Sequence, residues 1–237
     1  QPRSRGLGDV YKRQGLGLGH LELCVIAEEL GRFLAPVPFS SSVYLFTEAI
    51  INYANDDIKK DILPKLVSGE VIGTLAVAED LQAPTADNIS LQSDNNILNG
   101  KKIAVPDAEI ATHAIVVAKT SSGISLQLVD LNADGVKIEK QENIDESRGY
   151  FSILFENSPS KLIGDETGGW DLYEALMNQA AVLFGYEQIG GSQAALDMAI
   201  NYSKERYAFG RQIGSFQAIK HKLADMYLSL IHISEPT

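Results

Sequence analysis

Cationic, aromatic and amide side chains gather in one stretch of this chain, residues 202–226, which read YSKERYAFGRQIGSFQAIKHKLADM. Arg206 and Arg211 flank Phe209, and Gln217 follows shortly after them. A guanidinium offers forked donors that match phosphate oxygens, and an aromatic side chain can pack on a flat ring. These residues favour a site for an anionic ligand, and the structural alternative is a helix corner with solvated arginines.

The same stretch predicts two helices joined by a turn. The turn spans Gly210 to Gly214, and Ser215 can cap the second helix because its hydroxyl can accept a bond from a first-turn N–H. A helix N-terminus also offers positive potential, which suits a phosphate. Four apolar residues then recur at helical spacing and predict one buried face: Phe216, Ile219, Leu223 and Met226.

Written as Y-x-x-x-R-x-x-F-G-x-x-I-x-x-F-Q-x-x-x-H-x-L-A-D-M, this block resembles the signature of the acyl-CoA dehydrogenase family, flavoproteins that desaturate acyl-CoA thioesters. The runs ELGRFLAPVPF and ILPKLVSGE also resemble the N-terminal helical domain of that family. In the family, the Arg and Phe of R-x-x-F and the Gln of F-Q help to hold the FAD of the neighbouring subunit. The resemblance therefore implies an FAD site formed by Arg206, Phe209, Phe216 and Gln217.

The resemblance breaks where the family places hydroxyl groups against the flavin ring. The family segment T-E-P reads VAED at residues 77–80, so the hydroxyl is missing at Ala78. The family segment W-x-T or W-x-S reads IAV at residues 103–105, and Val105 replaces the second hydroxyl. We therefore expect weaker flavin binding, through apolar packing and backbone groups.

No catalytic residue can be assigned within this chain. In the family a glutamate removes the α-proton of the acyl-CoA while the β-hydrogen leaves as hydride to the flavin. In most members this glutamate lies in a C-terminal segment that the chain lacks. Some members place it at the position of Ala180, beside a substrate-contacting Arg that corresponds to Ala181.

Glu187 is the one isolated acid–base candidate, because it falls on the apolar stripe of a predicted long helix, where burial would raise its pKa. The simpler interpretation is a boundary glutamate paired with a neighbour, and Glu187 aligns with no family base.

Two functions remain open. The first is a piece of an FAD-dependent acyl-CoA dehydrogenase that desaturates an acyl-CoA at the α,β bond and passes electrons to a transfer acceptor. The second is a non-catalytic FAD-binding subunit of a hetero-oligomeric acyl-CoA dehydrogenase, which the losses at Ala78, Val105 and Ala181 favour. In either case the resemblance implies a homo- or hetero-oligomer, a dimer or tetramer, assembled through a helix bundle.

The chain as a whole predicts an α+β multidomain fold. Residues 15–70 read as N-terminal helices, residues 71–160 as a central antiparallel β-barrel, and residues 161–228 as the first half of a helix bundle. Helices are expected near 18–30, 40–53, 58–67 and 170–207. Strands are expected at 71–78, 111–119, 124–130, 136–140 and 151–156, with turns at 94–96, 99–100, 121–123 and 133–135.

Both ends, residues 1–14 and 229–237, resemble translated adaptor sequence and are left out of the fold prediction. The net charge of -11 argues against nucleic-acid or anionic-membrane partners. Apolar runs are shorter than the roughly 18 residues of a membrane helix, and no signal peptide is recognisable, so we expect a soluble, cytoplasmic protein. The single cysteine, Cys24, is expected to be a buried thiol, and no metal site is expected.

Overall fold

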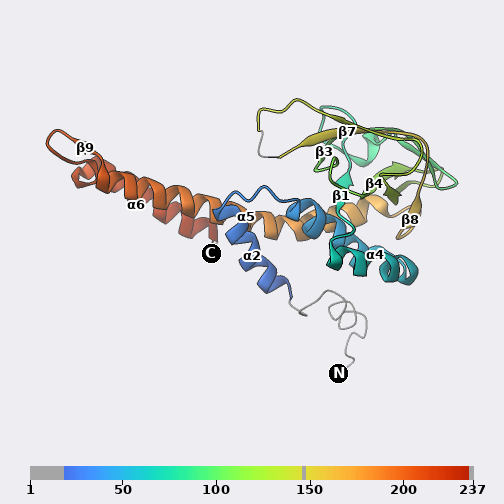
Figure 1. Cartoon of the computed structure of the whole chain (residues 1–237), viewed down its shortest axis with the longest axis horizontal. Coiled ribbons are helices and arrows are strands. Elements are labelled where there is room, and N and C mark those ends of the chain that lie inside the picture. Colours follow the sequence, from blue (N-terminus) through green and yellow to red (C-terminus); the bar gives the residue numbers. More distant parts are fainter. Residues whose placement is uncertain (1–18, 146–147, 235–237) are drawn as a thin grey trace, which may run out of the picture. The chain divides into compact units, whose positions relative to one another are not determined.

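The computed structural model describes residues 19–145 and 148–234 (Figure 1). They divide into two compact units: residues 36–180 belong to the first, and residues up to 35 together with those from 181 onward belong to the second. The adaptor-like segment at 1–14 and residues 235–237 of the other lie outside the described residues, and the boundaries at 70 and 160 stay predictions. Within the described parts, no helix is long and apolar enough to cross a membrane.

The first unit begins with helices, as the sequence predicts. Asn55 caps the last of them, because its side chain accepts a hydrogen bond from the N–H of Ile58 at 2.9 Å. The helix ends at Gly69, whose φ of +77° is left-handed. These elements are the π-helix η1 (Ser40–Thr47) and the α-helices α3 (Glu48–Tyr53) and α4 (Asp56–Ser68).

The strands of the first unit form one mixed sheet, not the predicted antiparallel barrel. Its order is β6-β7-β3-β2-β4-β5-β8, with β1 paired to β4, and both the β1–β4 and β2–β4 pairings are parallel. In the described residues β6 and β8, at the two ends of this order, do not pair, so the sheet is open. The strands are β1 (Gly73–Ala76), β2 (Gln92–Asp94), β3 (Ile97–Pro106), β4 (His113–Lys119), β5 (Ile124–Asp130), β6 (Val136–Lys140), β7 (Tyr150–Pro159) and β8 (Lys161–Ile163). The alternating runs in the sequence predict strands, but they do not indicate whether the sheet closes into a barrel.

The turn expected at residues 99–100 is wrong, because both residues lie inside β3. Gly100 has a φ of +142° there, and a Cβ on it would lie 3.0 Å from the Leu91 side chain, so glycine serves a close approach within the sheet. Strand β3 is not predicted from the sequence, because its polar NGKK run is typical of a turn. The turn at 94–96 is confirmed, since Asn95 and Asn96 have positive φ.

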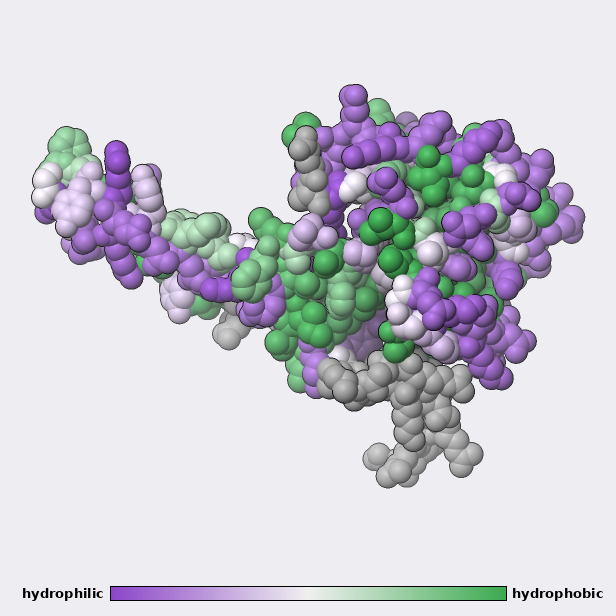
Figure 2. Space-filling model, viewed as in Figure 1, coloured by the Kyte–Doolittle hydropathy of each residue, from purple (hydrophilic) through white to green (hydrophobic). Residues whose placement is uncertain are grey.

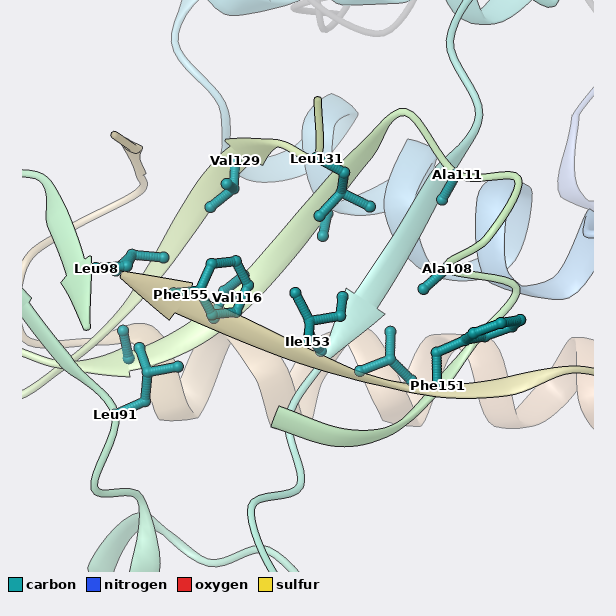
Figure 3. Packing of buried hydrophobic residues seen from close by; sticks show 14 residues of the cluster. Leu91, Leu98, Ala108, Ala111, Val116, Val129, Leu131, Phe151, Ile153 and Phe155 are labelled. Carbon is teal, nitrogen blue, oxygen red and sulfur yellow. The ribbon is translucent and has the colours of Figure 1, made fainter. Parts of the chain in front are cut away.

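One apolar cluster forms the core of the sheet (Figure 3). It draws residues from β3, β4, β5 and β7 and from the segments that connect them. Its largest members are Phe151, Ile153 and Phe155 of β7, which are 4% exposed or less. Burial of such side chains is the main favourable contribution to folding, at roughly 1.5–3 kcal/mol each. This core includes Leu98 and Val105 and so holds β3 in place. Residues 103–105 of β3 are the segment compared with the flavin-contacting part of the family.

The helix α5 (Gly169–Glu205) runs through both units and confirms the predicted long helix. The second unit adds α2 (His20–Arg32) and α6 (Gln217–Ser234). In α2 the buried residues are Cys24, Ala27 and Gly31, whereas the apolar Leu21 and Val25 are exposed. The prediction for the Cys24 thiol is confirmed, and burial raises its pKa.

Glycines let α2 and α5 approach closely within the second unit. A Cβ on Gly190 would lie 1.8 Å from the backbone oxygen of Glu28, and one on Gly31 would lie 1.8 Å from that of Glu187. Both distances are far inside van der Waals contact. Gly190 and Gly31 are therefore sites of close helix approach, whereas Gly185 has open space around the position of an added Cβ.

Candidate functional site

A small hairpin reverses the chain between α5 and α6 (Figure 1). Its strands β9 (Tyr207–Ala208) and β10 (Arg211–Gln212) pair antiparallel, and Phe209 and Gly210 form the turn with φ of +54° and +78°. The short 3₁₀-helix η3 (Ile213–Ser215) then leads into α6. The chain turns between the two helices as predicted, but the turn lies at Phe209 and Gly210, and Arg211 and Gln212 of the predicted turn form β10.

Phe209 projects from this turn and is 96% exposed. Positive φ is uncommon for a residue with a bulky side chain, and burial of the ring would be favourable. Its ring lies edge-on to that of Phe216, with 6.3 Å between centroids, and makes no other ring contact in the described residues. The chain thus holds a large aromatic ring in solvent, where it is free to pack against another molecule.

Arg206 directly follows α5 and Gln217 is the first residue of α6, so both flank the hairpin in the sequence. Both are exposed, and neither side chain has a hydrogen bond or ion pair to the described part of the chain. The guanidinium of Arg211 lies 4.0 Å from the centre of the Phe216 ring, so that arginine is held by a cation–π contact. In Figure 2, hydrophobic and hydrophilic residues lie next to one another at this tip, labelled β9 in Figure 1.

The structure corrects two details of the predicted second helix. Ser215 does not cap α6, because its hydroxyl donates to the carbonyl oxygen of Gln212 at 2.6 Å. Gln217 is the first residue of α6, so its side chain begins at the helix N-terminus itself. Of the expected buried face, Phe216 and Leu223 are half-buried and Met226 is 43% exposed.

The four residues expected to hold FAD therefore all belong to the hairpin segment between α5 and α6 and to the first residue of α6, in the second unit. Together they offer a cation, an amide and an exposed aromatic ring near a helix N-terminus, and this donor set fits a dinucleotide that carries both phosphate and flat rings.

In the first unit, residues 77–79 and 102–105 include the segments compared with the flavin-contacting part of the family. The N–H of Ile103 donates to the carbonyl oxygen of Ala78 at 2.8 Å, so the two segments lie side by side. Ala78 and Ile103 are half-buried and Val105 is 1% exposed. Their side chains are apolar, so a flavin ring here would meet methyl groups and the backbone.

An ion pair that the sequence does not predict lies next to these segments. Lys102 is 0% exposed, and its Nζ donates to Glu79 Oε1 at 2.7 Å and to the carbonyl oxygen of Val77 at 2.8 Å. The same carboxylate accepts hydrogen bonds from the N–H groups of Ser90 and Leu91, at 2.9 and 3.0 Å, and from the Ser90 hydroxyl. The sequence carries no signal for this pair, because the NGKK run that contains Lys102 is typical of a turn and Glu79 lies 23 residues away.

Burial lowers the pKa of Lys102 to about 8, although Glu79 stabilises the charged form. Burial also opposes the Glu79 carboxylate, but hydrogen bonds from Lys102, Ser90 and Leu91 outweigh it and lower the pKa of Glu79.

This gives a prediction for stability as a function of pH. An unfolded Lys102 has a pKa near 10.5, so between pH 8 and 10.5 the unfolded chain binds more protons than the folded chain. The wild-type chain should therefore gain up to about 3 kcal/mol relative to Lys102→Met as the pH rises through this window. Urea unfolding of both proteins at several pH values measures it, and parallel curves would contradict it.

The positions on α5 compared with family catalytic residues hold small side chains. Ala180 is buried and Ala181 is exposed. Glu187 is half-buried and lies four residues after the buried Leu183 in α5, as expected for a residue at the boundary of the apolar stripe. Trp170, at the start of α5, donates its indole N–H to Glu174 at 2.7 Å. None of these arrangements adds an acid–base pair to the site.

Comparison with known proteins relates two long segments of the chain to one family. Residues 11–70 match the model of the acyl-CoA dehydrogenase N-terminal domain, and residues 167–233 match that of the C-terminal domain. The chain is 33% identical to isovaleryl-CoA dehydrogenase from Pongo abelii, a mitochondrial protein, over 92% of this chain and 56% of that one.

Two solved structures have the same fold. A variant of the Tcur3481-Tcur3483 steroid ACAD is 30% identical, with a TM-score of 0.80, over 95% of this chain and 62% of that one. The FAD complex of PigA is 25% identical, with a TM-score of 0.82, over 93% of this chain and 62% of that one.

The chain belongs to the acyl-CoA dehydrogenase family. It spans about half the length of the curated relatives that it matches, 56% for isovaleryl-CoA dehydrogenase.

Proposed function

We propose that this chain is the FAD-binding part of an acyl-CoA dehydrogenase that desaturates an acyl-CoA thioester at the α,β bond. The observation that carries the proposal is the hairpin tip, where Phe209 is 96% exposed beside Arg206 and Gln217. Exposed side chains of this kind, with few contacts to the described chain, are what a ligand-binding edge requires. The named FAD complex of PigA, a relative in fold, supports FAD as the ligand.

Each group has a defined part in binding. Arg206 would donate to phosphate or other polar oxygen atoms of FAD, and Gln217 to polar atoms near the α6 N-terminus. Phe209 would pack against a flat ring and exclude water from it. Because all three face outward from their own unit, they suit an FAD that is shared with a second subunit. When bound, FAD supplies the acceptor for the hydride that leaves the β-carbon.

The two positions of α5 that are compared with family catalytic residues do not supply the proton acceptor for this reaction. A base must lie within hydrogen-bond reach of the α-proton, and neither Ala180 nor Ala181 has a side chain that can take one. A glutamate from sequence beyond this chain would have to do so. Electrons would then pass to a separate transfer protein. The cytoplasmic location stays a prediction, and the relative from Pongo abelii is a mitochondrial protein.

A second function is favoured by specific losses. The hydroxyl groups missing at Ala78 and Val105 and the small residues at 180 and 181 together suit a subunit that binds FAD but performs no catalysis. Such a subunit would pair with an active homologue and contribute Arg206, Phe209 and Gln217 across the interface. The retained hairpin tip agrees with both functions.

Activity measurements on a chain extended by its native downstream sequence separate the two. The protein is saturated with FAD and assayed with acyl-CoA thioesters of several chain lengths and an artificial electron acceptor. Turnover by the chain alone supports the dehydrogenase. FAD binding with turnover only after addition of an active family member supports the non-catalytic subunit, and absence of FAD binding in both cases contradicts both.

A further inference from the structure

Val77, Ala78 and Glu79, which directly follow β1, each accept hydrogen bonds from residues 90–103. The carbonyl oxygen of Val77 accepts from Lys102 Nζ, and that of Ala78 accepts from the N–H of Ile103. The carboxylate of Glu79 accepts from Lys102 and from the N–H groups of Ser90 and Leu91. One lysine and one glutamate thereby join the end of β1, the start of β2 and the middle of β3.

This network carries a cost that ordinary packing does not require. A fully buried ammonium must be desolvated, and an apolar residue of similar volume often replaces a buried ion pair without loss of stability. A methionine at residue 102 would fill the same space. The ion pair is therefore better explained by the geometry that it imposes on residues 77–79 than by stabilisation of the core.

The residues fixed in this way are those compared with the flavin-contacting segments of the family. Ala78 and Val105 have lost the hydroxyl groups that would orient a ring through side-chain hydrogen bonds. The remaining means of orientation are backbone groups and methyl surfaces, which act only if the backbone is held in place. Lys102 and Glu79 hold it on both sides of Ala78.

We propose that Lys102 and Glu79 are positioning residues for the flavin ring, which hold residues 77–79 against residues 103–105 in the arrangement on which the ring packs. This inference rests on the proposed function for its ligand. It concerns residues of the first unit alone and is independent of the hairpin tip.

The test compares Lys102→Met with two matched controls in the full chain. Lys137→Met removes an ion pair of the same length, 2.7 Å to Glu156, from an exposed position on the same sheet. Val129→Ala removes buried volume from the core cluster and lowers global stability without touching the network. For each protein we measure FAD affinity by titration and amide hydrogen exchange at Ser90, Leu91 and Ile103, under conditions in which circular dichroism shows it folded.

We expect Lys102→Met to weaken FAD binding tenfold or more and to speed exchange at these three amides at least tenfold. Lys137→Met and Val129→Ala should leave FAD affinity within about twofold of wild type. Glu79→Gln should weaken binding as well, because it removes the charge that holds Lys102.

A pH profile adds a result that loss of stability alone does not produce. Glu79 is the charged group that shifts the pKa of Lys102, and Lys102 is the charged group that shifts the pKa of Glu79. The FAD affinity of the wild-type chain should fall as Lys102 loses its proton near pH 8, whereas that of Lys102→Met should not change there.

Two outcomes overturn the inference. Equal FAD affinity and equal exchange in wild type and Lys102→Met would show that the ion pair orders neither segment. A loss of affinity in Val129→Ala as large as in Lys102→Met would reduce the effect to general destabilisation. If the wild-type chain binds no FAD either alone or mixed with an active family member, the proposed function fails, and the exchange rates then decide separately whether the network orders residues 77–79 and 103–105.

Discussion

Replacement of Gly190 by alanine is expected to lower the free energy of unfolding by about 2–3 kcal/mol. The added Cβ would lie 1.8 Å from the backbone oxygen of Glu28 and 2.9 Å from the backbone nitrogen of Arg32. Because both contacts are with backbone atoms of α2, the helices must move apart. This cost exceeds the gain of roughly 1 kcal/mol that alanine brings to a helix interior.

Gly185→Ala is the matched control for this prediction. It lies in the same helix, and no atom lies within 4 Å of the position that its Cβ would take. This variant should be as stable as wild type or more stable by up to about 1 kcal/mol. Urea unfolding of the three proteins measures the difference. If Gly190→Ala proved as stable as Gly185→Ala, the close approach of α2 and α5 would be wrong.

The second large effect is expected at the hairpin tip. Arg206→Ala and Phe209→Ala should each weaken FAD binding about ten- to a hundredfold, since one loses charge-assisted hydrogen bonds and the other an aromatic contact. Both side chains are exposed, so their removal should leave the melting temperature nearly unchanged. FAD titration and thermal unfolding, measured on the same samples, separate binding from stability.

Phe33→Ala provides the control for the loss of an exposed aromatic ring. Phe33 also lies in the second unit and is 75% exposed, but it is far along the sequence from the hairpin. Its replacement should leave FAD affinity unchanged. An equal loss of affinity in Phe33→Ala and Phe209→Ala would indicate a nonspecific effect of surface hydrophobicity, and unchanged affinity in Phe209→Ala would exclude that ring from the site.

Much of the fold could be predicted from periodicity and turn residues. The apolar runs that became β4, β5 and β6 are recognisable because their alternation or continuous apolarity is a local property. Strand β3 was missed because its NGKK run is typical of a turn, and tertiary pairing with β7 overrides that preference. The open, mixed sheet could not be predicted either, because pairing of β1 and β2 with β4 joins residues far apart in sequence.

The candidate site shows the same division between local and long-range information. The order of Arg206, Phe209 and Gln217 along the chain made the hairpin tip recognisable. The partnership of Lys102 with Glu79 spans 23 residues and depends on the burial of a lysine, which neither composition nor spacing indicates. Ser215 illustrates a smaller error, since a hydroxyl near a helix start can donate backward along the chain instead of capping forward.

The most direct test of FAD binding is the flavin absorbance that remains with the chain after gel filtration in excess FAD. We predict retained flavin at about one FAD per chain, either for the chain alone or after it is mixed with an active family member. Retention by the chain alone would show that apolar packing at Ala78 and Val105, with the hairpin tip, is sufficient. Absence of flavin from both samples would contradict the assignment of this chain as an FAD-binding subunit.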